Sequence, residues 1–416
     1  MRGMAPDGGL YVPESIPGLD PGSFEPSPEL SLHSIGARVL SPFIDCLSEQ
    51  ALKSIIANAW NFPIPLIKLE DRIYLLELFH GPTLAFKDVG ARFMAHVMSH
   101  LLEQQHQQLT IIVATSGDTG SAVAHGFFHL ANIDVFVLYP SGMISRLQEQ
   151  QMTTLGGNIT AVEVEGTFDD CQRLVKSALS DSELQNKRAL TTANSINVGR
   201  LLPQIAYYVW GLIQMKEKFR EASPPLMVVP SGNFGNLTAA VYAKRMGAPI
   251  RSFVAATNAN DVVVEYLRTG SFSPRPGIQT YSNAMDVGNP SNLARLQTFF
   301  KHDVLEFRRW IDAVSITDEE TLNEIRCTYE QTNYVLDPHT AVAVAATRKI
   351  MKGTSEVPVM VAATAHPAKF PEVVKETTGL EVPLPDRLQE AANKPKHSIK
   401  IREYREWREL LITTTT

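Results

Sequence analysis

The stretch LTIIVATSGDTGSAVAHGF, residues 109–127, decides the expected fold. An apolar, β-branched run ends at Thr115, a turn with two glycines follows, and the segment ends in an alanine-rich run with helical spacing. A strand that passes through a Gly-rich turn into a helix is typical of α/β sheets. Such a turn presents backbone N–H groups at a positive helix end, and the hydroxyls of Ser116 and Thr119 add donors. It therefore suits a carboxylate or phosphate, although a capped turn that serves only the helix is the alternative.

The same alternation continues along the chain. We expect strands at residues 72–78, 109–115, 134–139, 160–164, 226–230, 252–257 and 357–364, and helices at 35–60, 91–105, 121–130, 146–154, 199–220, 238–247 and 341–351. This order predicts an α/β fold with mostly parallel sheets flanked by helices. Because single cores stop growing near about 250–300 residues, a chain of 416 residues should form two lobes.

Composition excludes several classes of protein. The chain has 38 basic and 44 acidic residues and no long basic run, so a nucleic-acid partner is not expected. No window approaches the roughly 18 consecutive apolar residues of a membrane span, and the first residues have no apolar core of a secretory signal. Its three cysteines lie far apart, and no His, Cys or carboxylate cluster has metal-ligand spacing. We therefore expect a cytoplasmic protein with reduced thiols and no metal site.

Lys87 is the first candidate for chemistry. In GPTLAFKDVGARFMAHVM, residues 81–98, it precedes an amphipathic helix and follows Leu84, Ala85 and Phe86. Partial desolvation among these residues would lower its pKa and free the amine as a nucleophile, as a Schiff-base lysine requires. The alternative is a surface lysine that pairs with Asp88.

A second Gly-rich loop follows the strand expected at 226–230. It consists of Ser231, Gly232, Asn233, Phe234, Gly235 and Asn236 and leads into a helix. Its glycines allow close approach of the backbone to a phosphate, which the amides would bind. The pattern is neither G-x-x-x-x-G-K-[ST] nor G-x-G-x-x-G, so it argues against a nucleotide hydrolase and a dinucleotide-binding site.

Three further segments place polar residues at element ends. In VPVMVAATAHPAKFPE, residues 357–372, the expected strand ends at Thr364, which is suited as a neutral partner for a heterocycle nitrogen. His366 follows it and is either a general base or a structural histidine. ANSINVGRLLPQ, residues 193–204, contains Asn194 and Arg200, and Arg200 is suited to bind an anion bidentately. In DPHTAVAVA, residues 337–345, helix capping is the expected role of the first residues.

In this order, HGPT-x-AFKD, TSGDTG, ANSIN, PSGNFGN and TAHPAKF resemble the threonine synthase family of fold-type II pyridoxal-phosphate enzymes. NAMDVGNPSN, residues 283–292, and DPHTAVA also match, and the resemblance extends from PDGGLYVP to about residue 375. It implies a two-lobed fold similar to the tryptophan synthase β chain. The implied parts are an N-terminal arm and helical segment at 1–60, a larger cofactor-binding lobe at 61–90 and 200–385, a smaller α/β lobe at 91–199, and a C-terminal tail at 386–416. From about Asn393 the tail is charged and ends in four threonines, so we expect a surface appendage there.

The resemblance also implies roles for single residues. Lys87 matches the lysine that carries pyridoxal 5'-phosphate, Asp118 corresponds to an amide or acid near the pyridine hydroxyl, and Thr364 matches the partner of the pyridine nitrogen. The loop that binds the cofactor phosphate corresponds to Ser231, Gly232, Asn233, Phe234, Gly235 and Asn236. The candidates for holding the carboxylate and phosphate of the substrate are Ser116, Thr119, Asn194 and Arg200.

The implied activity converts O-phosphohomoserine and water into L-threonine and phosphate. A lyase that releases 2-oxobutyrate from the same substrate, and a pyridoxal-phosphate-binding protein without catalysis, are the alternatives. We expect a monomer or a homodimer. Family members usually carry a further N-terminal segment, often with a Y-x-STRG motif, before the residues that match APDGGLYVP. The resemblance therefore gives no prediction of how the N-terminus of this chain packs.

Overall fold

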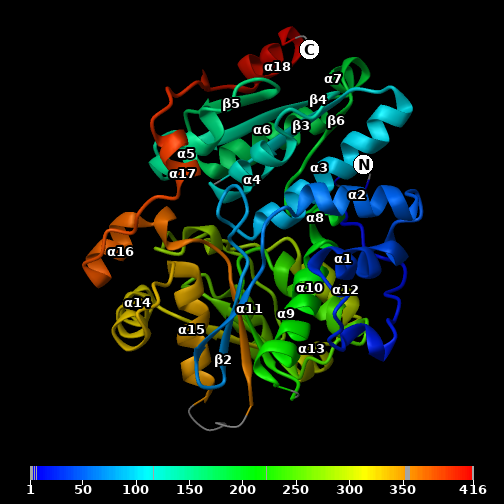
Figure 1. The fold of residues 1–416 in the computed structure, drawn as a ribbon. Helices are drawn as coiled ribbons and strands as arrows, with labels where there is room; N and C mark the ends of the chain where they lie inside the picture. Colours follow the sequence, from blue (N-terminus) through cyan, green and yellow to red (C-terminus); the bar gives the residue numbers. More distant parts are fainter. Residues whose placement is uncertain are drawn as a thin grey trace.

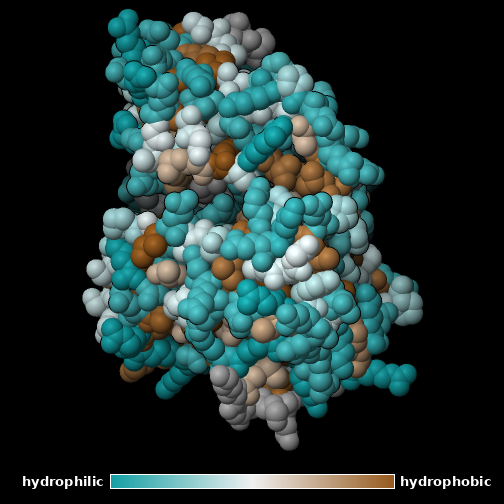
Figure 2. Space-filling view, turned by 90° about the vertical axis from the view of Figure 1, so that its left-hand side faces the viewer, coloured by the Kyte–Doolittle hydropathy of each residue, from teal (hydrophilic) through white to brown (hydrophobic). Residues whose placement is uncertain are grey.

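The computed structural model describes residues 3, 5, 7–115, 117–221, 223–351 and 357–414, which form two lobes, each built on one sheet. In Figure 1 the lobe with β3, β4 and β5 lies above the lobe with β2 and α15, and the chain passes between them more than once. Figure 2 shows one face of the molecule, on which hydrophilic side chains predominate and hydrophobic ones appear in small groups. The expected α/β fold with two lobes is confirmed.

The larger sheet has six strands in the order β1-β2-β10-β7-β8-β9. Their bounds are β1 (Leu66–Glu70), β2 (Ile73–Glu77), β7 (Leu226–Pro230), β8 (Ser252–Thr257), β9 (Ile311–Ser315) and β10 (Val359–Ala363). β1 and β2 are antiparallel, whereas the other neighbours are parallel. In β10, Met360 and Ala362 face one buried cluster, and Val359 and Val361 face another. Both faces of the sheet are therefore covered, which explains the continuous apolar runs of its strands.

The smaller sheet has five parallel strands in the order β11-β5-β4-β3-β6. Their bounds are β3 (Leu109–Ala114), β4 (Ile133–Pro140), β5 (Ile159–Val164), β6 (Leu190–Thr191) and β11 (Ile399–Ile401). Val113 packs in a cluster with residues of α3 and α4, and Ile112 in a cluster with residues of α6 and α18. Helices thus cover both faces of this sheet as well.

The helices surround these two sheets. Their bounds are α1 (Leu32–Leu40), α2 (Glu49–Ala59), α3 (Lys87–Gln105), α4 (Asp118–Phe127), α5 (Arg146–Thr153), α6 (Phe168–Ser180), α7 (Ser182–Lys187), α8 (Val198–Leu201), α9 (Gln204–Phe219), α10 (Gly235–Arg245), α11 (Val262–Thr269), α12 (Leu293–Phe299), α13 (Val304–Trp310), α14 (Asp318–Thr332), α15 (Pro338–Met351), α16 (Pro371–Thr378), α17 (Asp386–Ala392) and α18 (Tyr404–Thr413). The short 3-10 helices include η3 (Asn283–Met285) and η4 (Pro367–Lys369).

All the expected strands form within one or two residues of the predicted bounds, but two expected helices are divided. The range 35–60 contains α1 and α2, because Ser48 accepts a hydrogen bond from the Ala51 N–H and starts a new helix. The range 199–220 contains α8 and α9, which meet at Pro203, a residue without an N–H donor. The short strands β1, β6, β9 and β11 were not predicted.

The prediction that the C-terminal segment is a surface appendage is wrong. β11 pairs with β5 and extends the smaller sheet. Trp407 on α18 is fully buried, and its ring packs edge-on against Phe136 with 5.5 Å between the ring centroids. The segment gives a weak local signal, because β11 has three residues and charged residues predominate in the first half of α18. Its partners lie more than 200 positions earlier in the chain.

The N-terminal arm lies along the larger lobe. The Leu19 N–H donates to the Met246 carbonyl at 2.8 Å, and the Arg295 guanidinium donates to the Tyr11 carbonyl at 3.0 Å. The described residues contain no helix that is long and apolar enough to cross a membrane.

Candidate active site

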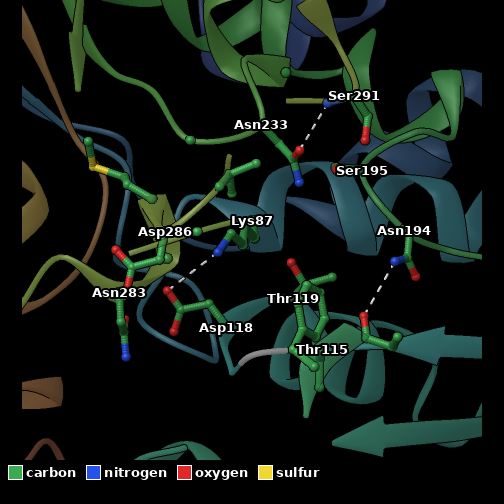
Figure 3. Close-up of a pocket in the computed structure, with 18 of the residues that line it drawn as sticks. Lys87, Thr115, Asp118, Thr119, Asn194, Ser195, Asn233, Asn283, Asp286 and Ser291 are labelled. Carbon is green, nitrogen blue, oxygen red and sulfur yellow. Dashed lines mark hydrogen bonds and ion pairs between the residues drawn. The ribbon is translucent and has the colours of Figure 1, made fainter. Parts of the chain in front are cut away.

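A cavity of about 480 Å³ lies between the lobes, where strands of both sheets end. Ala114 at the end of β3, Pro140 at the end of β4 and Pro230 at the end of β7 line it. Open α/β sheets place ligands at this edge, because helix N-termini point toward it. Figure 3 shows the side chains around the cavity, with Lys87 near its centre.

Lys87 is the first residue of α3, and its side chain is 14% exposed. Its Nζ lies 3.6 Å from Asp118 Oδ2 (Figure 3). Burial lowers the pKa of Lys87, and the charge of Asp118 opposes this shift only in part. The predicted desolvated amine is therefore confirmed. The alternative pair with Asp88 is wrong, because Asp88 turns away and accepts hydrogen bonds from the N–H and hydroxyl of Thr83 at 2.8 and 2.7 Å.

Asp118 begins α4 and makes the strongest polar contacts of the site. Its Oδ1 accepts hydrogen bonds from Lys369 Nζ at 2.5 Å and from Gln148 Nε2 at 3.0 Å. Burial alone would raise the pKa of Asp118, but the ammonium groups of Lys369 and Lys87 outweigh it and hold the pKa well below its usual range. Asp118 is therefore a carboxylate inside the protein. The contacts with Lys369 and Gln148 were not predicted, since these residues lie far from Asp118 in sequence.

The loop after β7 presents free donors to the cavity. Gly232, Asn233, Phe234, Gly235 and Asn236 line the cavity, and among the described residues nothing accepts a hydrogen bond from their backbone N–H groups. A Cβ at Gly232 would lie 2.8 Å from the Ala284 carbonyl oxygen, so only glycine fits there. Asn233 Oδ1 accepts from the Ser291 N–H at 3.2 Å, which holds the loop (Figure 3). The loop thus has the free N–H groups that an anion site needs.

The ends of the predicted loop have other contacts. Ser231 lies behind the loop and does not line the cavity. Its hydroxyl donates to the Val229 carbonyl at 2.9 Å, and its N–H donates to the Ala256 carbonyl at 2.9 Å. The Asn236 side chain donates to the Pro230 carbonyl at 2.9 Å, so it fixes the end of β7 to the start of α10. Both side chains therefore hold the loop in place.

Thr364 follows β10 and lines the cavity on the same side as Lys87. Its backbone carbonyl accepts from the Phe86 N–H at 2.9 Å, which ties the strand end to the segment before Lys87. Its N–H donates to the Thr340 hydroxyl at 3.3 Å. The Thr364 hydroxyl forms no hydrogen bond within the described residues, so this donor and acceptor remains available to a ligand. His366 does not line the cavity; its Nδ1 accepts from the Ala368 N–H at 3.1 Å, as a structural histidine does.

Three of the four predicted substrate residues line the cavity, and the fourth, Ser116, lies outside the described residues. Thr119 lies in the first turn of α4 with its hydroxyl toward the cavity (Figure 3). Asn194 donates to the Ala114 carbonyl at 3.3 Å. Arg200 is 4% exposed and donates to the Ala193 carbonyl at 2.9 Å, and its buried Nε has no partner among the described residues. Burial lowers the pKa of Arg200 to about 10, so it remains a cation at neutral pH.

A turn within NAMDVGNPSN, to which the sequence analysis assigned no role, forms another wall. Asn283 and Asp286, around η3, line the cavity, and Asn283 Oδ1 is buried without a partner. His339 Nε2 accepts from the Ala284 N–H at 3.1 Å, and Asp337 contacts the other ring nitrogen at 2.9 Å. Capping by Asp337 is confirmed by its bond with the His339 N–H. Burial raises the pKa of Asp286 to about 6. No group of three or more described His, Cys, Asp or Glu side chains is arranged to hold a metal ion.

A buried amine with a lowered pKa, a loop whose N–H groups are unpaired within the described residues, and a free hydroxyl surround one cavity. They fit a cofactor that has an aldehyde, a phosphate and a ring nitrogen. With the two-lobed α/β fold, they define the class of pyridoxal-phosphate-dependent enzymes, and the family model "Pyridoxal-phosphate dependent enzyme" matches residues 60–364. Models for the threonine synthase N terminus and for "Threonine synthase, C-terminal" match residues 1–60 and 340–410. The chain belongs to the threonine synthase family.

Individual relatives agree over nearly the whole chain. The chain is 44% identical to threonine synthase of Haemophilus influenzae over 93% of its own length and 89% of the relative, and 41% identical to that of Escherichia coli over 95% and 90%. Among solved structures, pyridoxal-phosphate-bound threonine synthase from Brucella melitensis has a TM-score of 0.92 at 34% identity and covers 99% of this chain and 94% of its own. The E. coli structure has a TM-score of 0.89 at 40% identity with the same coverage.

Proposed function

We propose that this protein is a threonine synthase that converts O-phosphohomoserine and water into L-threonine and phosphate. The observation that carries the proposal is the position of the Lys87 amine, which is largely buried in a cavity that residues 232–236 and the Arg200 cation also line. The full-length similarity to threonine synthases of known name supports the same reaction.

Residues on three elements would hold the cofactor. The N–H groups of residues 232–236 would bind its phosphate, with Asn233 held by Ser291 so that the loop keeps its shape. The free Thr364 hydroxyl would meet the ring nitrogen, and Asp118 would lie near the ring hydroxyl. Lys87 would form the covalent link through its amine. Pyridoxal phosphate, when bound, withdraws electrons from the carbon skeleton of an attached amino acid.

Lys87 would also move protons during the reaction. With substrate bound in the cavity, the free Nζ of Lys87 would lie beside Cα and Cβ of the substrate. Because burial lowers its pKa, the amine gives up a bound proton more readily than an exposed lysine does, which suits a group that accepts and returns protons. One residue would thus remove a proton at Cα and then at Cβ, which allows the γ-phosphate to leave.

The remaining polar residues would bind the two anionic groups of the substrate. Arg200 has a buried Nε without a partner, and a phosphate or carboxylate oxygen would satisfy it. The hydroxyls of Ser116 and Thr119 and the amide of Asn194 would complete this set. A departing phosphate would be stabilised by the same groups that bind it in the substrate.

The test begins with the cofactor link. The purified protein should show the visible absorption band of pyridoxal phosphate bound to a lysine, and Lys87→Ala should lose it. Lys375→Ala is the matched control, because Lys375 is exposed and pairs with Glu381 far from the cavity. A wild-type protein without this band after addition of pyridoxal phosphate would contradict the proposal.

Product analysis then separates the two outcomes that the same residues allow. With O-phosphohomoserine, we expect threonine and inorganic phosphate in equal amounts. Formation of 2-oxobutyrate and ammonia without threonine would show that the enzyme is a lyase that does not direct water to Cβ. Absence of any turnover with an intact absorption band would indicate a binding protein.

The proposal includes the setting in which the enzyme acts. Cys46, Cys171 and Cys327 form no disulfide, as is usual in a reducing compartment, and we place the enzyme in the cytoplasm. Its partner there is the small-molecule substrate. We propose a monomer or a homodimer, which light scattering of the purified protein distinguishes.

A further inference from the structure

We propose that Lys369 is a positioning residue that binds Asp118 as a buried counter-ion, so that Lys87 has no full ion-pair partner and reacts as the neutral amine. The inference rests on the proposed function, because it takes Lys87 as the lysine that carries the cofactor. Lys369 ends η4 in the larger lobe, and Asp118 begins α4 in the smaller lobe. Their pair therefore joins the two lobes directly behind the reacting amine.

The distances show which lysine holds the carboxylate. Lys369 is 1% exposed, and its Nζ lies 2.5 Å from Asp118 Oδ1 and 3.1 Å from the Thr83 carbonyl oxygen. Lys87 Nζ lies 3.6 Å from Asp118 Oδ2, which is longer than an ordinary hydrogen bond. Gln148 donates to Oδ1 as well. Asp118 is thus bound mainly on the side away from Lys87.

The charges around Lys87 favour its neutral form. The titratable or charged groups of the surrounding elements are Asp88 on α3, Asp118 on α4, Arg200 on α8, Asp286 after η3, His339 on α15 and Lys369 on η4. Burial is the main cause of the lowered pKa of Lys87; Asp118 raises this pKa, whereas Lys369 and Arg200 lower it further. Since Lys369 offsets the charge of Asp118, the balance favours the neutral amine.

The neutral state matters for a definite chemical step. The lone pair of the Lys87 nitrogen would add to the aldehyde carbon of pyridoxal phosphate and form a carbon–nitrogen bond. The aldehyde oxygen would then leave as water together with the two hydrogens of the amine. A protonated amine has no lone pair to add. Without Lys369, no second lysine would offset the negative charge of Asp118. The carboxylate would then favour the ammonium form of Lys87.

The experiment measures this step without turnover. Cofactor-free full-length protein is mixed with pyridoxal phosphate across a pH series, samples are reduced with borohydride at set times, and the labelled peptide that contains Lys87 is quantified by mass spectrometry. In Lys369→Met, the pH of half-maximal rate should rise by about one unit, so at any pH below the wild-type midpoint the rate should fall by up to about tenfold. An unchanged midpoint would overturn the inference.

Two further variants separate charge from packing. In Lys369→Met/Asp118→Asn both members of the pair are neutral, and the midpoint should return toward that of the wild type, a rescue that a purely structural role would not give. Asp118→Asn alone should move the midpoint to lower pH, because Lys87 then loses its carboxylate and keeps the repulsion of Lys369. If Lys369→Met does not fold, the result for Asp118→Asn decides. An unchanged midpoint in that variant would overturn the inference.

The controls keep this test distinct from that of the proposed function. Lys375→Met, in which an exposed lysine is removed, should show the wild-type profile. If wild-type Lys87 is not labelled at any pH, the proposed function fails. If it is labelled and the Lys369 and Asp118 variants keep its midpoint, only the inference about Lys369 fails.

Discussion

The turn after β3 and the loop after β7 share one sequence pattern, but the structure uses their backbone donors differently. In the turn after β3, the N–H groups of Gly117 and Gly120 donate to Thr115 Oγ1 at 2.9 and 2.8 Å, and the carboxylate of Asp118 occupies the helix start. In the loop after β7, the N–H groups of residues 232–236 remain unpaired within the described chain. A strand, two glycines and a helix therefore do not by themselves define an anion site. A turn of this kind can bind an anion only where its backbone N–H groups have no acceptor within the protein.

The two segments also differ in charge. Asp118 has Lys369 and Lys87 close to it, whereas no carboxylate is among residues 231–236. The turn after β3 is thus the site of a buried ion pair, and the loop after β7 is a neutral set of donors. A negatively charged phosphate is expected at the second segment, and the following substitutions test this contrast.

The largest effect is expected for Asp118→Ala. It leaves Lys369 buried without its carboxylate, which should lower the free energy of unfolding by about 3–5 kcal/mol at neutral pH in urea titrations. The contribution has a defined pH dependence. Burial opposes ionisation of Asp118, but Lys369 and Lys87 hold its pKa below the usual value. The stabilisation is therefore complete above the unfolded-state pKa near 4 and is lost as the pH falls through the folded-state value.

A matched control for Asp118 is Glu49→Ala. Glu49 pairs with Lys53 at 2.5 Å on the surface, where water screens both charges. Its removal should change the stability far less than the removal of Asp118. Equal effects of the two substitutions would contradict the assignment of Asp118 as a buried counter-ion.

An intermediate effect is expected for Gly232→Ala. The added Cβ would lie 2.8 Å from the Ala284 carbonyl oxygen and from Met285 Cα, so the loop or the turn around η3 must move. Overpacking of this kind costs about 1–3 kcal/mol. Fluorescence titration should show weaker binding of pyridoxal phosphate. Gly22→Ala is the control, because its Cβ would meet nothing within 4 Å, and similar binding by both variants would speak against the loop as the phosphate site.

The smallest effect is expected for Asn233→Ala. It removes one hydrogen bond, which the Ser291 N–H donates, and leaves all N–H groups of the loop in place. The free energy of cofactor binding should become less favourable by about 1 kcal/mol, since the backbone N–H groups would still bind the phosphate. Calorimetric titration measures it. A loss as large as that of Gly232→Ala would mean that the side chain, rather than the backbone, makes the main contact.

Local sequence patterns predicted much of the larger architecture and few of the contacts inside the site. Strands such as β3 and β7 were found because they are mostly apolar and are followed within three residues by a glycine. β11 was missed, because a three-residue strand gains its stability from β5 and not from its own composition. In the same way, its own segment made Lys87 a candidate, whereas the acid that faces it was not predicted. The neighbour Asp88 binds Thr83, and the acid that faces Lys87 is Asp118.

The sequence by itself determined the alternation of strands and helices, the position of Lys87 before a helix, and the two Gly-rich turns, because these depend on residues close together in the chain. Only the tertiary structure decided that Lys369 reaches Asp118, that Gln148 joins them, and that Ser231 supports its loop from behind. Lys369 and Asp118 are separated by 251 positions. Side chains so far apart in sequence meet only where the packing of two lobes brings their elements together. The low dielectric of that interface strengthens the attraction between their charges.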